Sequence, residues 1–205
     1  MSQEVISEQT QSNLEILRKA GVLKGFYLAG GTGLALQLRH RISLDLDFFS
    51  KKKINPKTLI QKISTLGRFS VEKEEKDTLI GIFNKTNVSF FTYNYPLLFP
   101  LIKIKKISVA DIRDIGCMKI SAISSRGSKK DFVDVFFICQ SVSLKTLLAL
   151  FEKKYKGVNY NMVHILKSLV YFDDARKDPM PQMIKKISWP DIEEFFIKEV
   201  KAIKL

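Results

Sequence analysis

Apolar and polar positions along the first hundred residues follow the spacings of both helices and strands. Residues 8–20 carry apolar side chains at helical spacing and stop before Gly21, a residue type that often follows a helix. A second helix is predicted over 56–66, because Asn55 can cap it and Pro56 suits its first turn. Three later segments are predicted as strands, with a polar turn over 84–87 before the last one: 69–74, 78–83 and 88–93.

The pattern changes after residue 93. Pro96 and Pro100 interrupt 93–107, which predicts a segment that crosses between two parts of the molecule. Ser108 is the expected cap of a helix over 109–124, and a loop is expected over 124–130. Apolar side chains then recur at helical spacing in four further segments: 130–140, 143–157, 159–174 and 190–204.

These elements predict an α+β fold. We expect a mixed β-sheet core with flanking helices over residues 1–100 and a C-terminal helical domain over 101–205 that completes a cleft. The chain shows no internal repeat and no low-complexity segment.

Composition narrows the class of protein. The 45% of hydrophobic residues suffices for an ordinary core. No apolar run approaches the roughly 20 residues that span a bilayer, and the polar N-terminus lacks a signal-peptide pattern, so we expect a cytoplasmic protein without membrane contact. Two cysteines and two histidines are too few for a zinc cluster. The net charge of +13 favours a polyanionic partner, nucleic acid first, although a general lysine bias gives the same composition.

Residues 26–49 carry the strongest functional signal. An apolar strand runs into Gly30 and Gly31, and a helix is expected to restart at Thr32. The N–H groups of a first helical turn are unpaired and the helix dipole favours an anion there. Glycine also lets a phosphate approach the backbone, so this turn is a candidate phosphate cradle.

Asp45 and Asp47 lie on the next predicted strand. Residues two apart on a strand share a face, so the two carboxylates should lie side by side while Leu44, Leu46 and Phe48 face the other way. Neighbouring carboxylates are costly to bury without compensation, and a divalent cation compensates them well. Alone, this motif is often a solvated strand edge, just as a glycine pair is often a simple turn. Together the two motifs predict a site for a metal-bound nucleoside triphosphate.

A second group of charges lies between the predicted helices of the C-terminal half. Lys119 and Arg126 are seven residues apart and would share a helix face, and Asp131 and Asp134 share a face of the next helix. Two interpretations stay open. The basic residues neutralise the two acids in a helix hairpin, or they hold triphosphate oxygens while an aspartate orients them or acts as base.

In this order, three elements resemble the AbiEii/AbiGii-type nucleotidyltransferase toxins of type IV toxin-antitoxin systems, a branch of the DNA polymerase β superfamily. The elements are Gly30-Gly31-Thr32, the run RISLDLDFF over 41–49, and the segment from Lys119 through Arg126 to Lys129-Lys130-Asp131-Phe132-Val133-Asp134. The resemblance spans roughly residues 26–138, and the C-terminal third adds little to it.

The resemblance implies a minimal nucleotidyltransferase core with a helical domain, magnesium-dependent use of a nucleoside triphosphate, and transfer of nucleotides to the 3′ end of tRNA in several members. It also implies a cognate antitoxin as partner and a role in abortive infection, which is phage defence. By position, it implies phosphate or nucleotide contacts for a first set of residues: Gly30, Gly31, Thr32, Arg41, Ser43, Lys119, Arg126 and Lys130. It implies metal binding by Asp45 and Asp47, with Asp134 or Asp131 as the remaining catalytic acid.

One departure from the wider superfamily concerns a third metal-binding carboxylate. The superfamily commonly places it on a later strand, but the predicted strand 88–93 contains no acid. Glu72, Glu74 or Asp134 could take its place. This leaves three hypotheses: transfer of a nucleoside monophosphate to RNA, a catalytically degenerate module of the same fold that binds nucleotide or nucleic acid, and transfer of a nucleoside monophosphate to a protein side chain.

Overall fold

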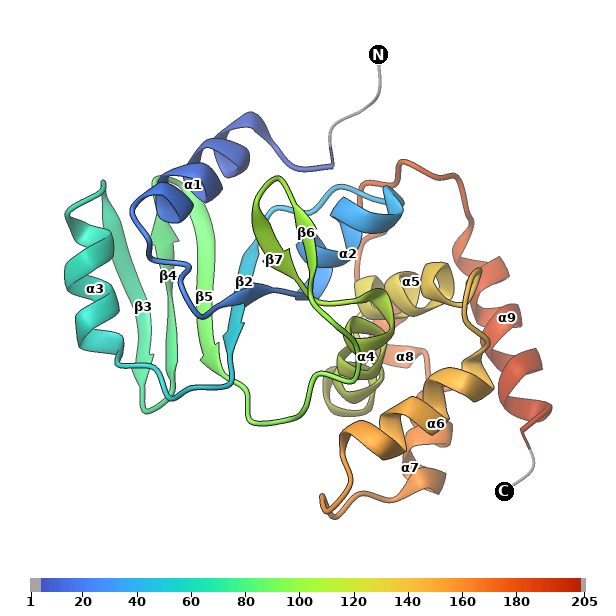
Figure 1. Ribbon diagram of the computed structural model, residues 1–205. Coiled ribbons are helices and arrows are strands. Elements are labelled where there is room, and N and C mark those ends of the chain that lie inside the picture. Colours follow the sequence, from blue (N-terminus) through green and yellow to red (C-terminus); the bar gives the residue numbers. More distant parts are fainter. Residues whose placement is uncertain (1–4, 204–205) are drawn as a thin grey trace.

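The computed structural model describes residues 5–203, and its centre is one mixed sheet (Figure 1). Within these residues the sheet has seven strands in the order β3-β4-β5-β2-β1-β7-β6. They are β1 (Tyr27–Leu28), β2 (Leu46–Ser50), β3 (Phe69–Glu75), β4 (Thr78–Phe83), β5 (Thr86–Thr92), β6 (Ile102–Ile104) and β7 (Ile107–Val109). The pairs β2/β5 and β1/β7 are parallel and the other neighbours are antiparallel. The predicted α+β class is confirmed.

Helices flank the sheet and fill the C-terminal half. The first three are α1 (Glu8–Lys19), α2 (Gly30–Leu38) and α3 (Pro56–Ser64). The C-terminal helices are α4 (Ile112–Arg126), α5 (Lys129–Ile138), α6 (Leu144–Lys154), α7 (Met162–Ser168), α8 (Asp173–Lys177) and α9 (Trp189–Lys201). In Figure 1 these six gather at the right of the sheet, while α3 lies beside β3 at the left. Among residues 5–203, none of the helices is long and apolar enough to cross a membrane.

Local signals explain α1 and α3, and both predicted helices are confirmed. The Asn55 side chain accepts a hydrogen bond from the N–H of Thr58 at the start of α3, as expected of a cap. Leu17 of α1 and Ile63 of α3 are fully buried in one hydrophobic cluster with Phe48 and other sheet residues. A second cluster joins the helices of the C-terminal half to the other side of the sheet. Each face of the sheet therefore has a hydrophobic cluster packed against part of it.

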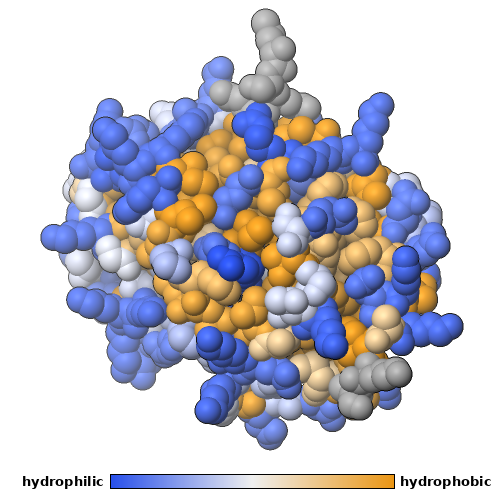
Figure 2. Space-filling model, turned by 45° about the vertical axis from the view of Figure 1, so that its right-hand side comes forward, coloured by the Kyte–Doolittle hydropathy of each residue, from blue (hydrophilic) through white to orange (hydrophobic). Residues whose placement is uncertain are grey.

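Hydrophobic surface lies in the middle of the face shown in Figure 2, and hydrophilic side chains crowd its margins. The large hydrophobic side chains that stay exposed come from several different elements: Leu44, Val71, Leu101, Val158, Val163, Val170, Tyr171 and Ile197. Exposed apolar side chains of this kind are ordinary in folded domains.

Some predicted boundaries were wrong. Ser108 does not cap α4; it lies in β7, and Asp111 caps the helix by accepting from the N–H of Arg113. Of the segment 93–107 predicted to cross between the two parts, residues 93–101 contain no helix or strand, but residues 102–109 form the β6–β7 hairpin, so the sheet continues past residue 100. Pairing with β1 across the sheet draws this segment into strands, a long-range effect that local patterns do not show.

Two loops are shorter than predicted. The loop expected over 124–130 shrinks to 127–128, because α4 continues to Arg126 and α5 begins at Lys129. The turn between β4 and β5 is Asn84-Lys85 rather than 84–87, and both residues adopt the left-handed conformation that two-residue hairpin turns require. Strand β5 thus begins two residues earlier than predicted, at Thr86.

A buried ion pair fixes α6 and the segment that leads from β5 to β6. Lys154 Nζ lies 2.7 Å from Asp114 Oδ1 and donates to the carbonyl oxygen of Pro96 at 2.7 Å. The same carboxylate accepts from the backbone N–H groups of Leu98 and Phe99. One fully buried acid on α4 therefore holds two other parts of the chain.

Replacing Lys154 with Met should lower the free energy of unfolding by about 3 kcal/mol, because the carboxylate of Asp114 stays buried without its cation. Lys177→Met is the matched control, since that lysine pairs with Asp174 at the surface and its loss should leave the free energy of unfolding almost unchanged. Urea denaturation followed by circular dichroism measures both. Equal curves for the two variants would contradict the role given to this pair.

Candidate active site

A cleft of about 560 Å³ opens between the sheet and the helical half. Among its lining residues are several of the predicted site residues: Gly31, Arg41, Ser43, Asp45, Asp47, Lys119, Arg126 and Lys130. The other predicted residues, Gly30, Thr32, Asp131 and Asp134, contact these residues from behind. Residues separated by some ninety positions in the chain thus meet at one place.

The two acids of the first motif stand at the start of β2. Leu46 and Phe48 are fully buried on the opposite face, as predicted. The prediction for Leu44 was wrong, because this side chain is 62% exposed and lines the cleft. Strand β2 begins only at Leu46, so the alternation of faces does not extend back to residue 44. Asp45 and Asp47 both line the cleft.

Strand β5 supplies polar neighbours for both acids. Asn87 Nδ2 donates to Asp45 Oδ1 at 2.9 Å. Ser89 is paired with Asp47 in the parallel register, and its side chain hydrogen-bonds that carboxylate. Burial raises the pKa of Asp47, and the nearby charge of Asp45 raises it further. A bound cation would relieve both effects, so this donor set fits a divalent metal.

The site offers two carboxylates to a metal. Within residues 5–203 no group of three or more His, Cys, Asp or Glu side chains could hold an ion. Glu72 also lines the cleft, but it lies on β3. Strands β4 and β5 separate β3 from β2, and at about 4.8 Å per strand spacing this places β3 about 14 Å from β2. Mg²⁺ typically binds through one or two carboxylates together with substrate phosphates and water. Asp45 and Asp47 would be sufficient protein ligands for such an ion.

The two glycines let other side chains come close to the backbone. Gly30 has φ +61°, and a Cβ there would lie 2.5 Å from Asp47 Oδ2. A Cβ on Gly31 would lie 2.4 Å from Arg41 Nη2. Helix α2 begins at Gly30, two residues before the predicted start at Thr32, so its first turn lies directly beside Asp47 and Arg41. The N–H groups of that turn are available to an anion in the cleft.

Thr32 is fully buried and lies behind the lining of the cleft. Its hydroxyl lies 2.8 Å from Ser43 Oγ and donates to the backbone carbonyl of Asp45. The side chain therefore ties the first turn of α2 to the segment that carries Asp45.

Asp131 and Asp134 are fully buried and bind three cations. Lys119 Nζ lies 2.8 Å from Asp131 Oδ1 and 2.7 Å from Asp134 Oδ2. Arg41 donates two hydrogen bonds to Asp134, from Nε to Oδ1 at 2.7 Å and from Nη2 to Oδ2 at 2.9 Å. Arg126 Nε lies 2.8 Å from Asp131 Oδ2. This is the ion-pair arrangement of the first interpretation, and it is built into the wall of the cleft.

Proton affinities follow from this network. Burial alone would raise the pKa of Asp131, but Lys119 and Arg126 outweigh it and lower the pKa to about 2. The pKa of Asp134 is likewise held well below its usual range by Lys119 and Arg41 against the effect of burial. Both carboxylates are therefore poor proton acceptors near neutral pH. An ammonium has three N–H donors, and Lys119 uses two on these acids, which leaves one for the cleft that it lines.

Sequence reasoning missed four residues that shape the cleft. His40 is fully buried with Nε2 2.8 Å from Asp134 Oδ1, and burial lowers its pKa, so it stays neutral. Gln182 lines the cleft and accepts from the N–H of Ile42 at 2.9 Å. Ser89 could have been found, because it lies on the predicted strand 88–93, whereas Asn87 falls in the predicted turn 84–87 and joins β5 only in the structure. His40 and Gln182 carry no such signal.

Gly30→Ala should destabilise the protein by about 2 kcal/mol or more, because the left-handed backbone strain is joined by a collision with Asp47. Gly25→Ala is the matched control, since Gly25 has φ +85° but open space around its Cβ position and carries only the strain of about 1 kcal/mol. Urea midpoints measure the difference. Indistinguishable urea midpoints would mean that the Asp47 side chain moves away from the added Cβ without loss of stability, which would contradict the prediction.

Acid should weaken the protein through Asp131 and Asp134. Their pKa values are lower in the fold than the unfolded value of about 3.9, so their contribution is complete above about pH 4 and is lost as pH falls toward 2. Asp131→Asn should therefore flatten the fall of the urea midpoint between pH 4 and 2. Asp173→Asn, at an exposed pair with Arg176, should keep the wild-type slope. A wild-type slope in Asp131→Asn would refute this assignment.

Comparisons with known proteins bear on the family and the fold of the chain. Residues 14–105 match the family model described as nucleotidyl transferase AbiEii toxin of the type IV toxin-antitoxin system. The chain is 38% identical over 202 residues to the uncharacterized protein aq_aa25 of Aquifex aeolicus (strain VF5), a match that covers 96% of each chain.

Two solved structures share the fold. JHP933 from Helicobacter pylori superposes with a TM-score of 0.53 at 19% identity, over 96% of this chain and 90% of that one. MenT4, a nucleotidyltransferase toxin from Mycobacterium tuberculosis H37Rv, superposes with a TM-score of 0.51 at 13% identity, over 97% of this chain and 87% of that one. At such identities the likeness concerns the fold alone.

Proposed function

Because the chain belongs to the AbiEii family of nucleotidyltransferase toxins of type IV toxin-antitoxin systems, we propose that it transfers a nucleoside monophosphate from a nucleoside triphosphate to the 3′ end of RNA, tRNA first. The observation that carries this proposal is one cleft in which two neighbouring carboxylates meet four basic side chains: Asp45 and Asp47 with Arg41, Lys119, Arg126 and Lys130. Such a cleft can bind a triphosphate and a divalent metal together.

Each side of the cleft has its own part in the reaction. Asp45 and Asp47 would hold Mg²⁺, which supplies neutralisation of phosphate oxygens when bound. The first turn of α2, Lys119 and Arg126 hold the triphosphate and stabilise negative charge on the leaving group. The acceptor hydroxyl oxygen bonds to the α-phosphorus, the bond from that phosphorus to the bridging oxygen breaks, and pyrophosphate leaves. The hydroxyl proton passes to solvent.

We assign positioning roles to the residues behind the lining. Asp131 and Asp134 hold the cations in place, since their carboxylates have no free side toward the cleft and their pKa values are low. Gly30 and Thr32 set the distance between α2 and the acids, and Arg41 and Ser43 support the segment between them. We place the protein in the cytoplasm, where its substrates are, with a cognate antitoxin as partner and phage defence as its role.

Incubation with each α-labelled nucleoside triphosphate, Mg²⁺ and total tRNA should label RNA. Asp45→Asn and Asp47→Asn should each lower the rate by about 10²-fold or more, because a lost ligand removes charge stabilisation at the reacting phosphate. Glu74→Gln, on β3 but outside the cleft lining, should keep the wild-type rate. RNA labelling at the wild-type rate in either Asp variant would contradict the metal-binding role proposed for Asp45 and Asp47.

The two-carboxylate site also favours a second candidate, a module of this fold that binds nucleotide or nucleic acid without transfer. Thermal stabilisation by nucleotide with no labelled product, across a broad set of acceptors, would identify it. Label that resists nuclease but not protease would instead identify a protein side chain as the acceptor.

A further inference from the structure

One face of the sheet lies open beside the cleft. The register places Asp47 opposite Ser89 and Ser89 opposite Ile80, so these three side chains share a face. Ile80 and Ile82 are two apart on β4, so Ile82 points the same way, and both are half-buried. The intervening residues of β4 face the other side, where Leu79 packs in the cluster that includes α1 and α3. Ile80 and Ile82 line cavities instead.

A second cavity of about 570 Å³ continues this face away from the cleft. Ile82 lines it, and Ile82 is paired with Asn87, which lines the catalytic cleft, so the two cavities are neighbours. Arg68 and Lys85 stand at its margin, are exposed, and have no side-chain hydrogen-bond or ion-pair partner within residues 5–203. Two basic side chains thus border a cavity that is polar apart from Ile82, next to the apolar position of Ile80.

The geometry of phosphoryl transfer in the cleft indicates from which side the acceptor hydroxyl approaches. The basic wall of Lys119 and Arg126 comes from α4, and β5 lies on the sheet side of Asp47. In phosphoryl transfer the attacking and leaving oxygens stand in line on opposite sides of the phosphorus. With the leaving pyrophosphate held at the basic wall, the attacking hydroxyl comes from the side of Ser89. The acceptor therefore approaches across β5 and β4.

We propose that the open face of β3, β4 and β5 binds the single-stranded 3′ end of the RNA acceptor, a proposal that rests on the proposed function. Bases lie on Ile80, Ile82 and the half-buried ring of Phe91, and backbone phosphates lie at Arg68 and Lys85. Apolar and aromatic sheet surfaces bind unstacked bases, and flanking cations bind the backbone.

We assign Glu72 a part in orienting the RNA strand. It lines the cleft from the edge strand β3, next to the register position of Ile80, and is exposed, so its charge repels phosphates from this part of the face. Bases rather than phosphates therefore occupy the apolar patch at Ile80. The phosphates are directed toward Arg68 and Lys85 at the margin.

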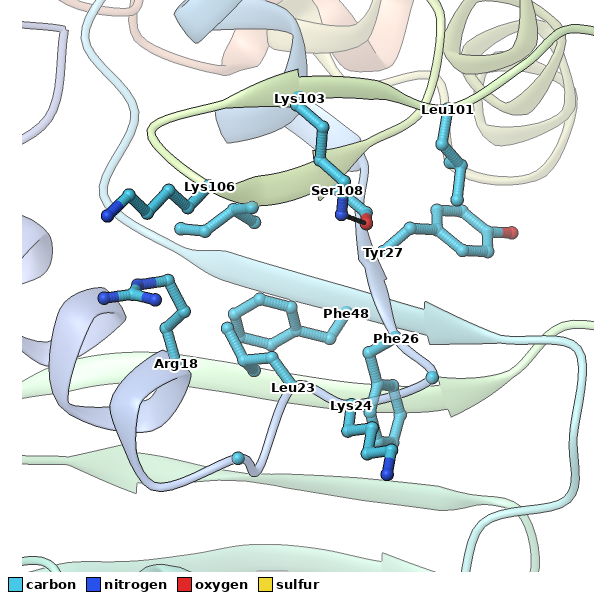
Figure 3. A pocket seen from close by; sticks show the side chains of 13 residues that line it. Arg18, Leu23, Lys24, Phe26, Tyr27, Phe48, Leu101, Lys103, Lys106 and Ser108 are labelled. Atoms are coloured by element: carbon cyan, nitrogen blue, oxygen red, sulfur yellow. Dashed lines mark hydrogen bonds between the residues drawn. The ribbon is translucent and has the colours of Figure 1, made fainter.

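A basic groove on the other face of the sheet provides a matched control. Phe48 lies on its floor, and the side chains of Lys24 and Lys106 border it (Figure 3). Phe48 and Asp47 are neighbours on β2 and point to opposite faces, so this groove cannot deliver a strand to the cleft. Lys24 and Lys106 are exposed, as Arg68 and Lys85 are.

The test compares Arg68→Glu/Lys85→Glu with Lys24→Glu/Lys106→Glu, two variants with the same change of net charge. Fluorescence anisotropy measures the Kd of a 5′-labelled single-stranded RNA of about 12 nucleotides, a span within the site sizes of such proteins. The first variant should bind about 10-fold more weakly in low salt, and its slope of log K against log salt should fall by about 1.4, for two lost phosphate contacts. The second should stay within about 3-fold of wild type, since it changes only the long-range field.

Equal losses in both variants, or wild-type binding by Arg68→Glu/Lys85→Glu, would overturn the proposal. Thermal melts of both variants check folding, and Arg68→Gln/Lys85→Gln replaces the first variant if its melting temperature falls. Normal labelling of RNA with unchanged binding would keep the proposed transferase and remove this face as its acceptor site. RNA binding that depends on Arg68 and Lys85, without any labelling of RNA, would keep this face as an RNA-binding surface and remove the proposed transferase activity.

Discussion

The two buried aspartates of α5 are the constraint on which the cleft depends. A carboxylate without water must be matched by cations, and Asp134 is matched by Arg41 from the sheet half and by Lys119 from α4. The same contact thus joins the two halves of the molecule and points basic side chains at the space between them. Removing the acids would leave Arg41 and Lys119 buried next to each other, so the basic wall could not exist in this form.

The four aspartates at the cleft fall into two pairs that differ in their surroundings. Asp131 and Asp134 are neutralised by protein cations, and their pKa values are low. Asp45 and Asp47 face each other, and burial together with the neighbouring charge raises the pKa of Asp47. The charges of the first pair are matched by basic side chains of the protein, whereas no ion pair within residues 5–203 compensates the second pair. This contrast separates the acids that build the wall from those that line the cleft.

How far the sequence predicts this arrangement depends on the range of the interactions. Asn55 acts locally, and the sequence predicts the helix that it caps, whereas α2 begins at Gly30, two residues before its predicted start. The β6–β7 hairpin depends on pairing with β1, so local patterns misplace the start of α4 at Ser108. The sequence predicts four charges near one another in the C-terminal half but leaves their roles open. Which of their N–H groups remain free for the cleft follows only from the distances in the fold.

The missing third carboxylate and the open sheet face have one physical origin. Strand β5 carries Ser89 where it pairs with Asp47, and Asn87 where it reaches Asp45, so this side of the cleft has hydrogen-bonding groups without charge. An acid at Ser89 would add a metal ligand, but it would also repel the phosphates of any strand approaching over β5. A neutral residue there keeps the approach open. Under the proposed function, a metal held by Asp45 and Asp47 would take its remaining ligands from the triphosphate, so metal binding and nucleotide binding would be coupled.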